Sequence, residues 1–209
     1  MVLYACTSGI LGWTGMTALA RGSLRARDLA DGISLPLRAL VALICAIGAL
    51  GAWFLLDDFI CCLSFSFACA CMSALLVCDL REHVLPTELV AGLLVFALVF
   101  RVTASGIRGA FAIALPAGLI AGSLLLANHL RMRHGADELI GSGDVRMIVP
   151  FTLFSGIDGI MAGVFACATL MGALALVQLA CGKAHRNTHI ALAPGLVAWL
   201  FVGTLLPLL

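Results

Sequence analysis

Long apolar stretches follow one another along almost the whole chain, and they restrict its fold more than any other feature. A helix that spans a bilayer needs about 20 mostly apolar residues, because the lipid interior offers no hydrogen-bond partner for bare backbone groups. Eight stretches meet or approach this length, at 2–20, 38–56, 59–78, 87–104, 109–129, 145–156, 159–181 and 190–208. The sequence therefore predicts an all-α membrane protein, a polytopic bundle of about eight transmembrane helices.

The overall composition supports lipid as the solvent. Of 209 residues, 63% are hydrophobic and 11% are charged, whereas a soluble chain is about 45–50% apolar and about 25% charged. The net charge of +1 leaves no basic excess for binding nucleic acid. No basic residue precedes the first apolar stretch, so we expect a retained span. The connecting segments are short, so we expect a single transmembrane domain over residues 1–209.

The basic residues are divided unevenly between the two predicted sides of the membrane. One side would carry Arg21, Arg25, Arg27, Arg38, Arg81, Arg131, Arg133, Arg146, Lys183 and Arg186. The other side would carry Arg101 and Arg108, together with Asp57, Asp58 and Asp158, which we interpret as turn residues. Because basic residues concentrate in cytoplasmic loops, the first side is predicted to be cytoplasmic. Both termini would then lie outside the cytoplasm.

Two aspartates fall at this predicted cytoplasmic boundary. Asp79 ends the third span, Asp144 opens the sixth, and the chain crosses the membrane and returns between them. Ionisable groups at membrane depth are costly and tend to be functional. Two neighbouring carboxylates share a proton, which supplies one base and one acid. The base would take a proton from water as it attacks a peptide carbonyl, and the acid would protonate the leaving amine.

Each of these positions also has a simpler interpretation. An Asp at a helix end is commonly a solvated or capping residue, and Asp144 suits the positive N-terminus of the next helix. Gly141 and Gly143 would form a turn, or would let an extended substrate backbone approach Asp144. Pro86 would start a helix at its first turn.

Two motifs around the aspartates resemble those of the type IV prepilin peptidase family, the bacterial branch of the GxGD aspartic peptidases. The first reads DLREHVLP over residues 79–86, with an Asp at a span end and a Pro opening the next helix. The second reads GSGDVR over residues 141–146, and the family commonly shows Lys where Arg146 stands. Pro194-Gly195 resembles the family's C-terminal signature in weaker form. The resemblance covers roughly residues 59–209.

The resemblance implies an aspartic endopeptidase of the bacterial inner membrane. Such enzymes cleave the basic leader from prepilins or pilin-like secretion subunits (pseudopilins), after a Gly, at the cytoplasmic membrane face. By this resemblance Asp79 and Asp144 are the catalytic pair, and neither a metal nor a cofactor is required. Four further residues would support the motifs or bind substrate: Pro86, Gly141, Gly143 and Arg146. The expected partners are the prepilin or pseudopilin substrate and the lipid bilayer.

One departure from the family concerns cysteine. Many bacterial members carry a cytoplasmic insertion with two CxxC pairs and also N-methylate the new terminus. The corresponding stretch here is only about 21–37 and contains no Cys. The nine cysteines of the chain form no CxxC pair and nearly all lie in apolar runs, so we interpret them as small apolar core residues. The resemblance therefore predicts cleavage and leaves methylation open.

Two other classes of protein remain alternatives. A proton-coupled transporter would use the Asp pair as a relay. Discontinuous helices or internal symmetry would favour this alternative, and the sequence shows no convincing pair of matched halves. A non-catalytic scaffold of a pilus or secretion system would keep its function after Asp-to-Asn substitution.

Overall fold

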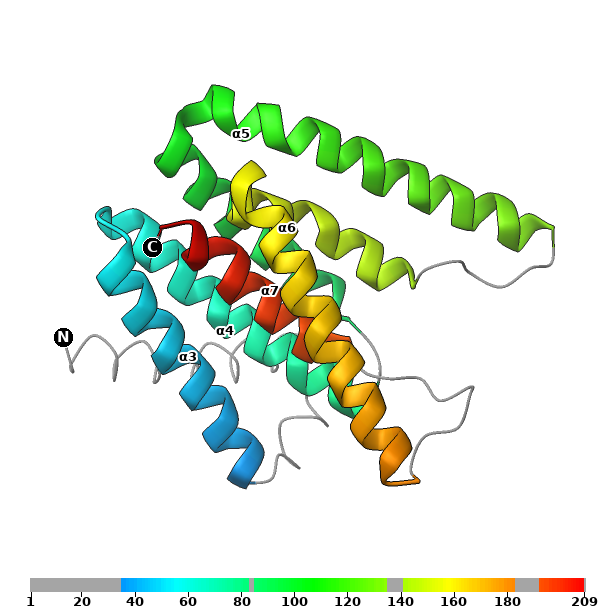
Figure 1. The fold of residues 1–209 in the computed structure, drawn as a ribbon. Coiled ribbons are helices and arrows are strands. Elements are labelled where there is room, and N and C mark those ends of the chain that lie inside the picture. The colour runs from blue at the N-terminus through cyan, green and yellow to red at the C-terminus, as the bar shows by residue number, and fades with distance from the viewer. Residues whose placement is uncertain (1–34, 83–84, 135–140, 183–191, 209) are drawn as a thin grey trace.

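The computed structural model describes residues 35–82, 85–134, 141–182 and 192–208 (Figure 1). All regular secondary structure in these ranges is helical, which confirms the predicted all-α class. The elements are α3 (Leu35–Leu55), α4 (Phe59–Glu82), α5 (Thr87–Arg133), α6 (Ser142–Ala180), α7 (Ala193–Leu205) and the 3-10 helix η1 (Leu206–Leu208). The predicted first span, 2–20, lies outside the described residues.

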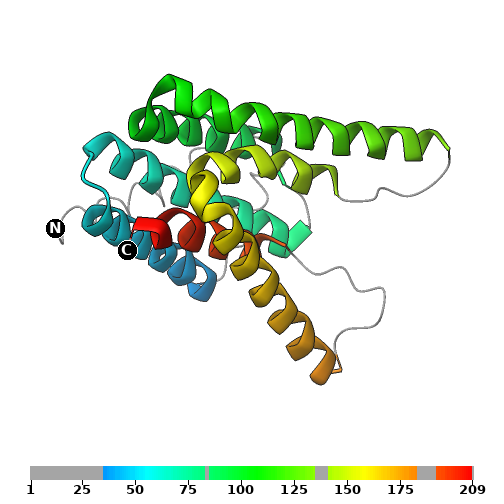
Figure 2. The same ribbon diagram turned by 45° about the horizontal axis from the view of Figure 1, so that its top comes forward.

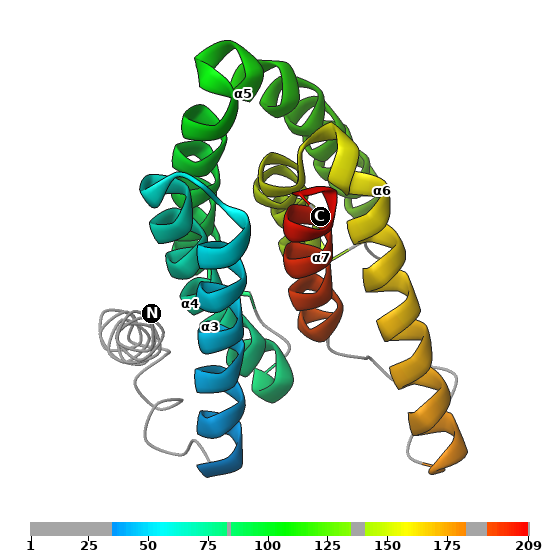
Figure 3. The ribbon, with the colours of Figure 1, turned by 60° about the vertical axis from the view of Figure 1, so that its left-hand side comes forward.

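Two of the helices are too long to cross a bilayer once. The 47 residues of α5 would extend about 70 Å as a straight helix, more than twice the ~30 Å hydrocarbon core. Both α5 and α6 are interrupted by a glycine with positive φ, at Gly106 (φ 73°, ψ 172°) and Gly156 (φ 65°, ψ −176°). Such angles favour glycine because it has no Cβ. Figure 3 shows that each helix turns back at its break and forms an arch with two arms.

These arms correspond to four of the predicted spans, but the connections differ from the prediction. We expected loops at 105–108 and 157–158, whereas the chain reverses at Gly106 and at Gly156 within otherwise helical segments. Three described helices are long and apolar enough to cross a membrane, α4, α5 and α6, and two shorter apolar helices accompany them. The helices therefore fit a membrane protein, while the count of about eight spans stays a prediction.

The outward faces of the arms are apolar. Phe111 and Leu115 on α5, and Met161 and Phe165 on α6, are all strongly exposed. Large exposed apolar patches are rare on soluble monomers. These faces therefore suit contact with lipid chains.

An aromatic cluster joins four helices at the centre of the bundle. Phe65 of α4 is fully buried, and its ring lies 6.4 Å from that of Phe100, 6.0 Å from that of Phe154 and 6.0 Å from that of Phe201. The contacts with Phe154 and Phe201 are edge-to-face, the geometry that the aromatic quadrupole favours. The cluster fixes α4, α5, α6 and α7 relative to one another.

Glycines bring α6 and α7 into close contact. A Cβ at Gly159 would overlap the carbonyl oxygen of Gly203, and a Cβ at Gly163 would overlap the ring of Trp199. Small residues four apart allow helix backbones to approach closely in lipid, where apolar burial alone gives little net attraction. The Trp199 indole N–H donates to Ser155 Oγ at 3.0 Å and adds a polar link between the two helices.

The helices meet at two opposite ends of the bundle, which Figures 1 and 2 show from different sides. We call one the aspartate end, where α4 finishes and α5, α6 and α7 begin. We call the other the arginine end, formed by the α3–α4 turn, the Gly106 and Gly156 breaks and η1. In that turn Asp58 Oδ1 accepts from the Ile60 N–H at 2.7 Å and caps α4, which confirms the predicted turn role of Asp58.

The described arginines divide between these ends as the positive-inside pattern predicted. The half of the bundle at the aspartate end holds five of them: Arg38, Arg81, Arg131, Arg133 and Arg146. Arg101 and Arg108 flank the Gly106 break on the arginine side. This division fits a bundle whose aspartate end faces the cytoplasm.

Candidate active site

Asp79 lies in the last described turn of α4. We expected the span to end at residue 78, but the helix continues to Glu82, so Asp79 belongs to the helix itself. Its side chain is only 7% exposed. The Oδ2 atom accepts a hydrogen bond of 2.7 Å from the backbone N–H of Ala193, the first residue of α7.

This bond makes Asp79 the cap of a helix that begins 114 residues later. The first N–H groups of a helix have no acceptor within it, and Leu192, at the N-cap position of α7, offers no side-chain acceptor. A carboxylate from α4 therefore fills the role that Ser, Thr, Asp or Asn commonly fills locally. The positive end of the α7 dipole faces a negatively charged side chain.

Asp144 lies in the first turn of α6. Gly141 is the N-cap, and its carbonyl accepts from the Val145 N–H at 3.1 Å. The Asp144 carboxylate turns back over this cap: a Cβ at Gly141 would lie 2.9 Å from Asp144 Oδ2. Glycine at position 141 therefore leaves room for the carboxylate.

The two carboxylates lie within electrostatic reach of each other, since the negative charge of Asp79 acts on Asp144. Like charges close together in a partly buried site are unfavourable, so this arrangement costs stability. Cys167, on the second arm of α6, also lies within electrostatic reach of Asp144.

Direct contacts join the two sequence motifs. A Cβ at Gly143 would lie 3.3 Å from the Leu85 side chain, so Gly143 allows the GSGD turn to pack against the first motif. Arg146 Nη1 donates to Thr87 Oγ1 at 3.1 Å across 59 residues of sequence. Pro86 stands at the N-cap of α5, directly before the first turn in which we expected it.

The late Pro-Gly pair completes the same end of the bundle. Pro194 lies in the first turn of α7, where its missing N–H costs nothing. A Cβ at Gly195 would come within 2.8 Å of Cys167 Sγ and within 2.6 Å of Met171 Cγ. The small residue lets α7 pack against the second arm of α6, and this packing holds the Ala193 N–H over Asp79.

Comparison with protein families supports the resemblance drawn from the motifs. Residues 66–177, more than half of the chain, match the model of the type IV leader peptidase family. The chain belongs to the type IV leader peptidase family. Comparisons with curated proteins and with solved structures found no match.

The leader peptidase match spans most of α4, all of α5 and most of α6, with both aspartate motifs inside it. It supports a leader peptidase activity in general. The match stops before α7, so Ala193, which holds the Asp79 carboxylate, lies outside it.

The structure brings every predicted site residue to the aspartate end. Sequence reasoning missed Leu85, Thr87 and Ala193, which contact those residues. Leu85 and Thr87 flank Pro86 in the sequence, and this position beside a predicted site residue could have indicated that they contact the site. The Ala193 N–H has no signature in the sequence, because every residue except proline carries one.

Proposed function

We propose that this protein is an aspartic endopeptidase that removes the basic leader from prepilins or pseudopilins, with Asp79 and Asp144 as its catalytic pair. The observation that carries this proposal is the packing of the two Asp-bearing motifs against each other at one end of an apolar bundle, through Gly143 against Leu85 and the hydrogen bond from Arg146 to Thr87. Placing like charges together costs stability, and a shared proton between them would offset that cost.

In the proposed reaction the pair holds one proton between its members. The ionised carboxylate removes a proton from a water molecule, and the water oxygen bonds to the carbonyl carbon of the scissile peptide. The protonated carboxyl stabilises the developing oxyanion and then gives its proton to the amine as the C–N bond breaks. The Ala193 N–H fixes one oxygen of Asp79 and so orients the carboxylate during both steps.

The motif residues would position this pair. Gly141 gives the Asp144 carboxylate its space, and Gly143 lets the GSGD turn approach Leu85. The sequence allowed two reasons for these glycines, a turn or access for a substrate backbone, and the contacts add a third, which is packing within the site. Pro86 and Arg146 fix the start of α5 next to the same turn.

The membrane placement follows from the same proposal. The protein would cross the bacterial inner membrane about eight times, with the aspartate end at the cytoplasmic face. A prepilin enters that face with its basic leader in the cytoplasm and its hydrophobic segment in the bilayer. The scissile bond between these two parts would then lie at the depth of Asp79 and Asp144.

Co-expression with a candidate prepilin tests the pair. Asp79→Asn and Asp144→Asn should each lower the rate of leader removal by about 10²–10⁴-fold, the usual loss when a general acid or base is removed. The matched control is Asp57→Asn, an exposed aspartate in the α3–α4 turn at the opposite end, which should cleave at the wild-type rate. Cleavage is measured by mass spectrometry of the mature pilin.

The choice of asparagine separates catalysis from folding. Asn at position 79 keeps an oxygen that can accept the Ala193 N–H, whereas Asp79→Ala leaves that donor without its partner. Asp79→Ala should therefore lose stability as well as activity, and Asp79→Asn should lose activity alone. Normal trimming by either Asn variant would refute the catalytic pair. Normal pilus assembly without any trimming would favour the scaffold alternative.

A further inference from the structure

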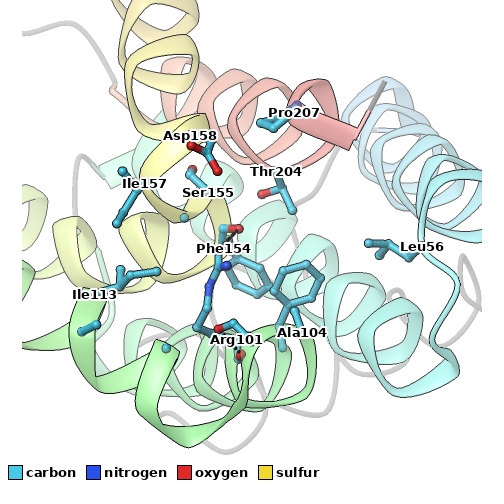
Figure 4. Close-up of a pocket in the computed structure, with 15 residues that line it drawn as sticks. Leu56, Arg101, Ala104, Ile113, Phe154, Ser155, Ile157, Asp158, Thr204 and Pro207 are labelled. Carbon is cyan, nitrogen blue, oxygen red and sulfur yellow. Dashed lines mark hydrogen bonds between the residues drawn. The ribbon is translucent and has the colours of Figure 1, made fainter.

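A cavity of about 360 Å³ lies at the arginine end, away from the aspartates (Figure 4). It is lined by residues of the α3–α4 turn, of the regions around the two glycine breaks and of the end of α7, and it opens to the surface. Its size is within the range of small-molecule sites, about 300–1,000 Å³. The leader peptidase proposal makes no use of it.

Arg101 is the cationic group of this cavity. Its Nε donates to the Leu153 carbonyl at 2.7 Å and its Nη2 donates to the Phe154 carbonyl at 3.0 Å. The break at Gly156 frees these carbonyls from the helical pattern. A guanidinium carries five N–H donors, so two bonds do not exhaust its capacity.

Thr204 supplies a second polar group. It is only 4% exposed, and its Oγ1 atom is buried with no hydrogen-bond partner in the described part of the chain. Buried hydroxyls are nearly always paired, because an unpaired one costs free energy. Figure 4 shows the Thr204 side chain on the cavity wall, facing the side where Arg101 and Phe154 lie. A ligand with a polar oxygen would satisfy this hydroxyl.

Asp158 gives the cavity a negative group. It follows the Gly156 break on the second arm of α6, lines the cavity and interacts electrostatically with Arg101. Apolar walls from Phe100 and Phe154 complete the lining. The cavity therefore offers one positive group, one negative group and one unpaired hydroxyl, with no net charge from its ionised side chains.

We propose that this cavity binds the headgroup of a phospholipid that carries both a phosphate and a primary ammonium. The phosphate would accept from Arg101 and Thr204, and the ammonium would donate to Asp158. Two observations favour a lipid over a soluble ligand. The reversals at Gly106 and Gly156 beside the cavity fall where predicted spans end, which the proposed membrane placement puts at the boundary opposite the aspartate end. The exposed side chains of Ile107 and Ile157 beside it give the acyl chains an apolar surface.

Native mass spectrometry of the full chain, stripped of lipid in detergent, tests the proposal. Phosphatidylethanolamine should bind about tenfold more tightly than phosphatidylglycerol, which lacks the ammonium. Asp158→Asn should remove this preference, and the control Asp57→Asn should keep it. Equal binding of both lipids by the wild type, or an unchanged preference in Asp158→Asn, would overturn the proposal.

Two further arms test the hydroxyl and the ligand source. Thr204→Val should weaken both lipids by about three- to tenfold, while Thr204→Ser, which keeps the hydroxyl, should bind as the wild type does. Equal losses in the two variants would contradict the role of the hydroxyl. Soluble glycerophosphoethanolamine should bind at least about tenfold more weakly than the lipid. Equal affinity would rule out the lipid assignment.

Discussion

The aspartate end and the arginine end of the bundle meet the same requirement with opposite charges. In an apolar surrounding, a helix that starts or breaks leaves backbone groups without partners. At the aspartate end the N–H of Ala193 is satisfied by the Asp79 carboxylate. At the arginine end the carbonyls of Leu153 and Phe154 are satisfied by the Arg101 guanidinium.

The two ends differ in the charged residue that neighbours the capping side chain. Arg101 has an aspartate, Asp158, within electrostatic reach, so its neighbour is attractive. Asp79 has a second aspartate, Asp144, within reach, so its neighbour is repulsive. An attractive pair stabilises the fold, whereas a repulsive pair lowers its stability. Changes at the arginine end should therefore affect stability and the proposed lipid binding, and changes at the aspartate end should affect mainly the proposed cleavage rate.

Substitution of Arg101 tests the arginine end and should give the largest loss of stability. Arg101→Met removes two charge-assisted bonds to the broken α6 and leaves both carbonyls without that donor, so the free energy of unfolding should fall by about 3 kcal/mol. Thermal unfolding in detergent measures the loss. Arg108→Met is the matched control, since Arg108 is exposed on the other side of Gly106, and it should change stability by less than about 0.5 kcal/mol. Equal loss in both variants would contradict the capping role.

The second prediction concerns the α6–α7 contact that joins the two ends. Gly159→Ala places a Cβ on the Gly203 carbonyl and should cost about 2 kcal/mol through overpacking. Gly172→Ala, on the same arm with open space around it, should be neutral or stabilising by up to about 1 kcal/mol, because Ala favours a helix over Gly. Unfolding curves in one detergent compare the two, and similar values would refute the close packing.

The smallest expected effect is a difference in cleavage rate between variants at two glycines of the GSGD motif. Gly141→Ala would push directly on the Asp144 carboxylate at 2.9 Å, and leader cleavage should slow by about tenfold or more, because small displacements of catalytic groups are costly. Gly143→Ala meets the Cβ and Cδ1 atoms of Leu85 at 3.3 Å, where a shift of a few tenths of an ångström relieves the contact, and should slow cleavage only about two- to threefold. Initial rates measure both variants. A larger effect at Gly143 would show that contact with the first motif matters more than space for the carboxylate.

Much of the fold was predictable because lipid imposes a simple requirement on sequence. Apolar stretches marked the helices, and the described arginines fall on the predicted sides. The breaks at Gly106 and Gly156 were not predicted as single-residue reversals. A hydropathy pattern locates a polar interruption, but the backbone angles at a glycine depend on the packing around it.

The site was predictable to a different degree. The motifs singled out six residues because each motif contains an unusual Asp, Pro or Gly, and the structure places these residues at one end of the bundle, while their roles stay a prediction. The Arg101 cavity was missed, because we interpreted Arg101 as an orientation signal alone. A lone arginine close to an apolar run could have indicated a structural or binding role in addition to orientation. The unpaired Thr204 hydroxyl gave no signal, since an ordinary threonine in a helix looks the same.

The hydrogen bond between Asp79 and Ala193 has a consequence for how the enzyme is made. A ribosome that has just added Asp79 must add another 114 residues before the donor for its carboxylate exists. Until α7 enters the membrane, the carboxylate lacks the group that orients it. If Asp79 has the proposed catalytic role, proteolytic competence should arise only with the insertion of α7. A nascent chain would be protected in this way from cutting other membrane proteins during its own biogenesis.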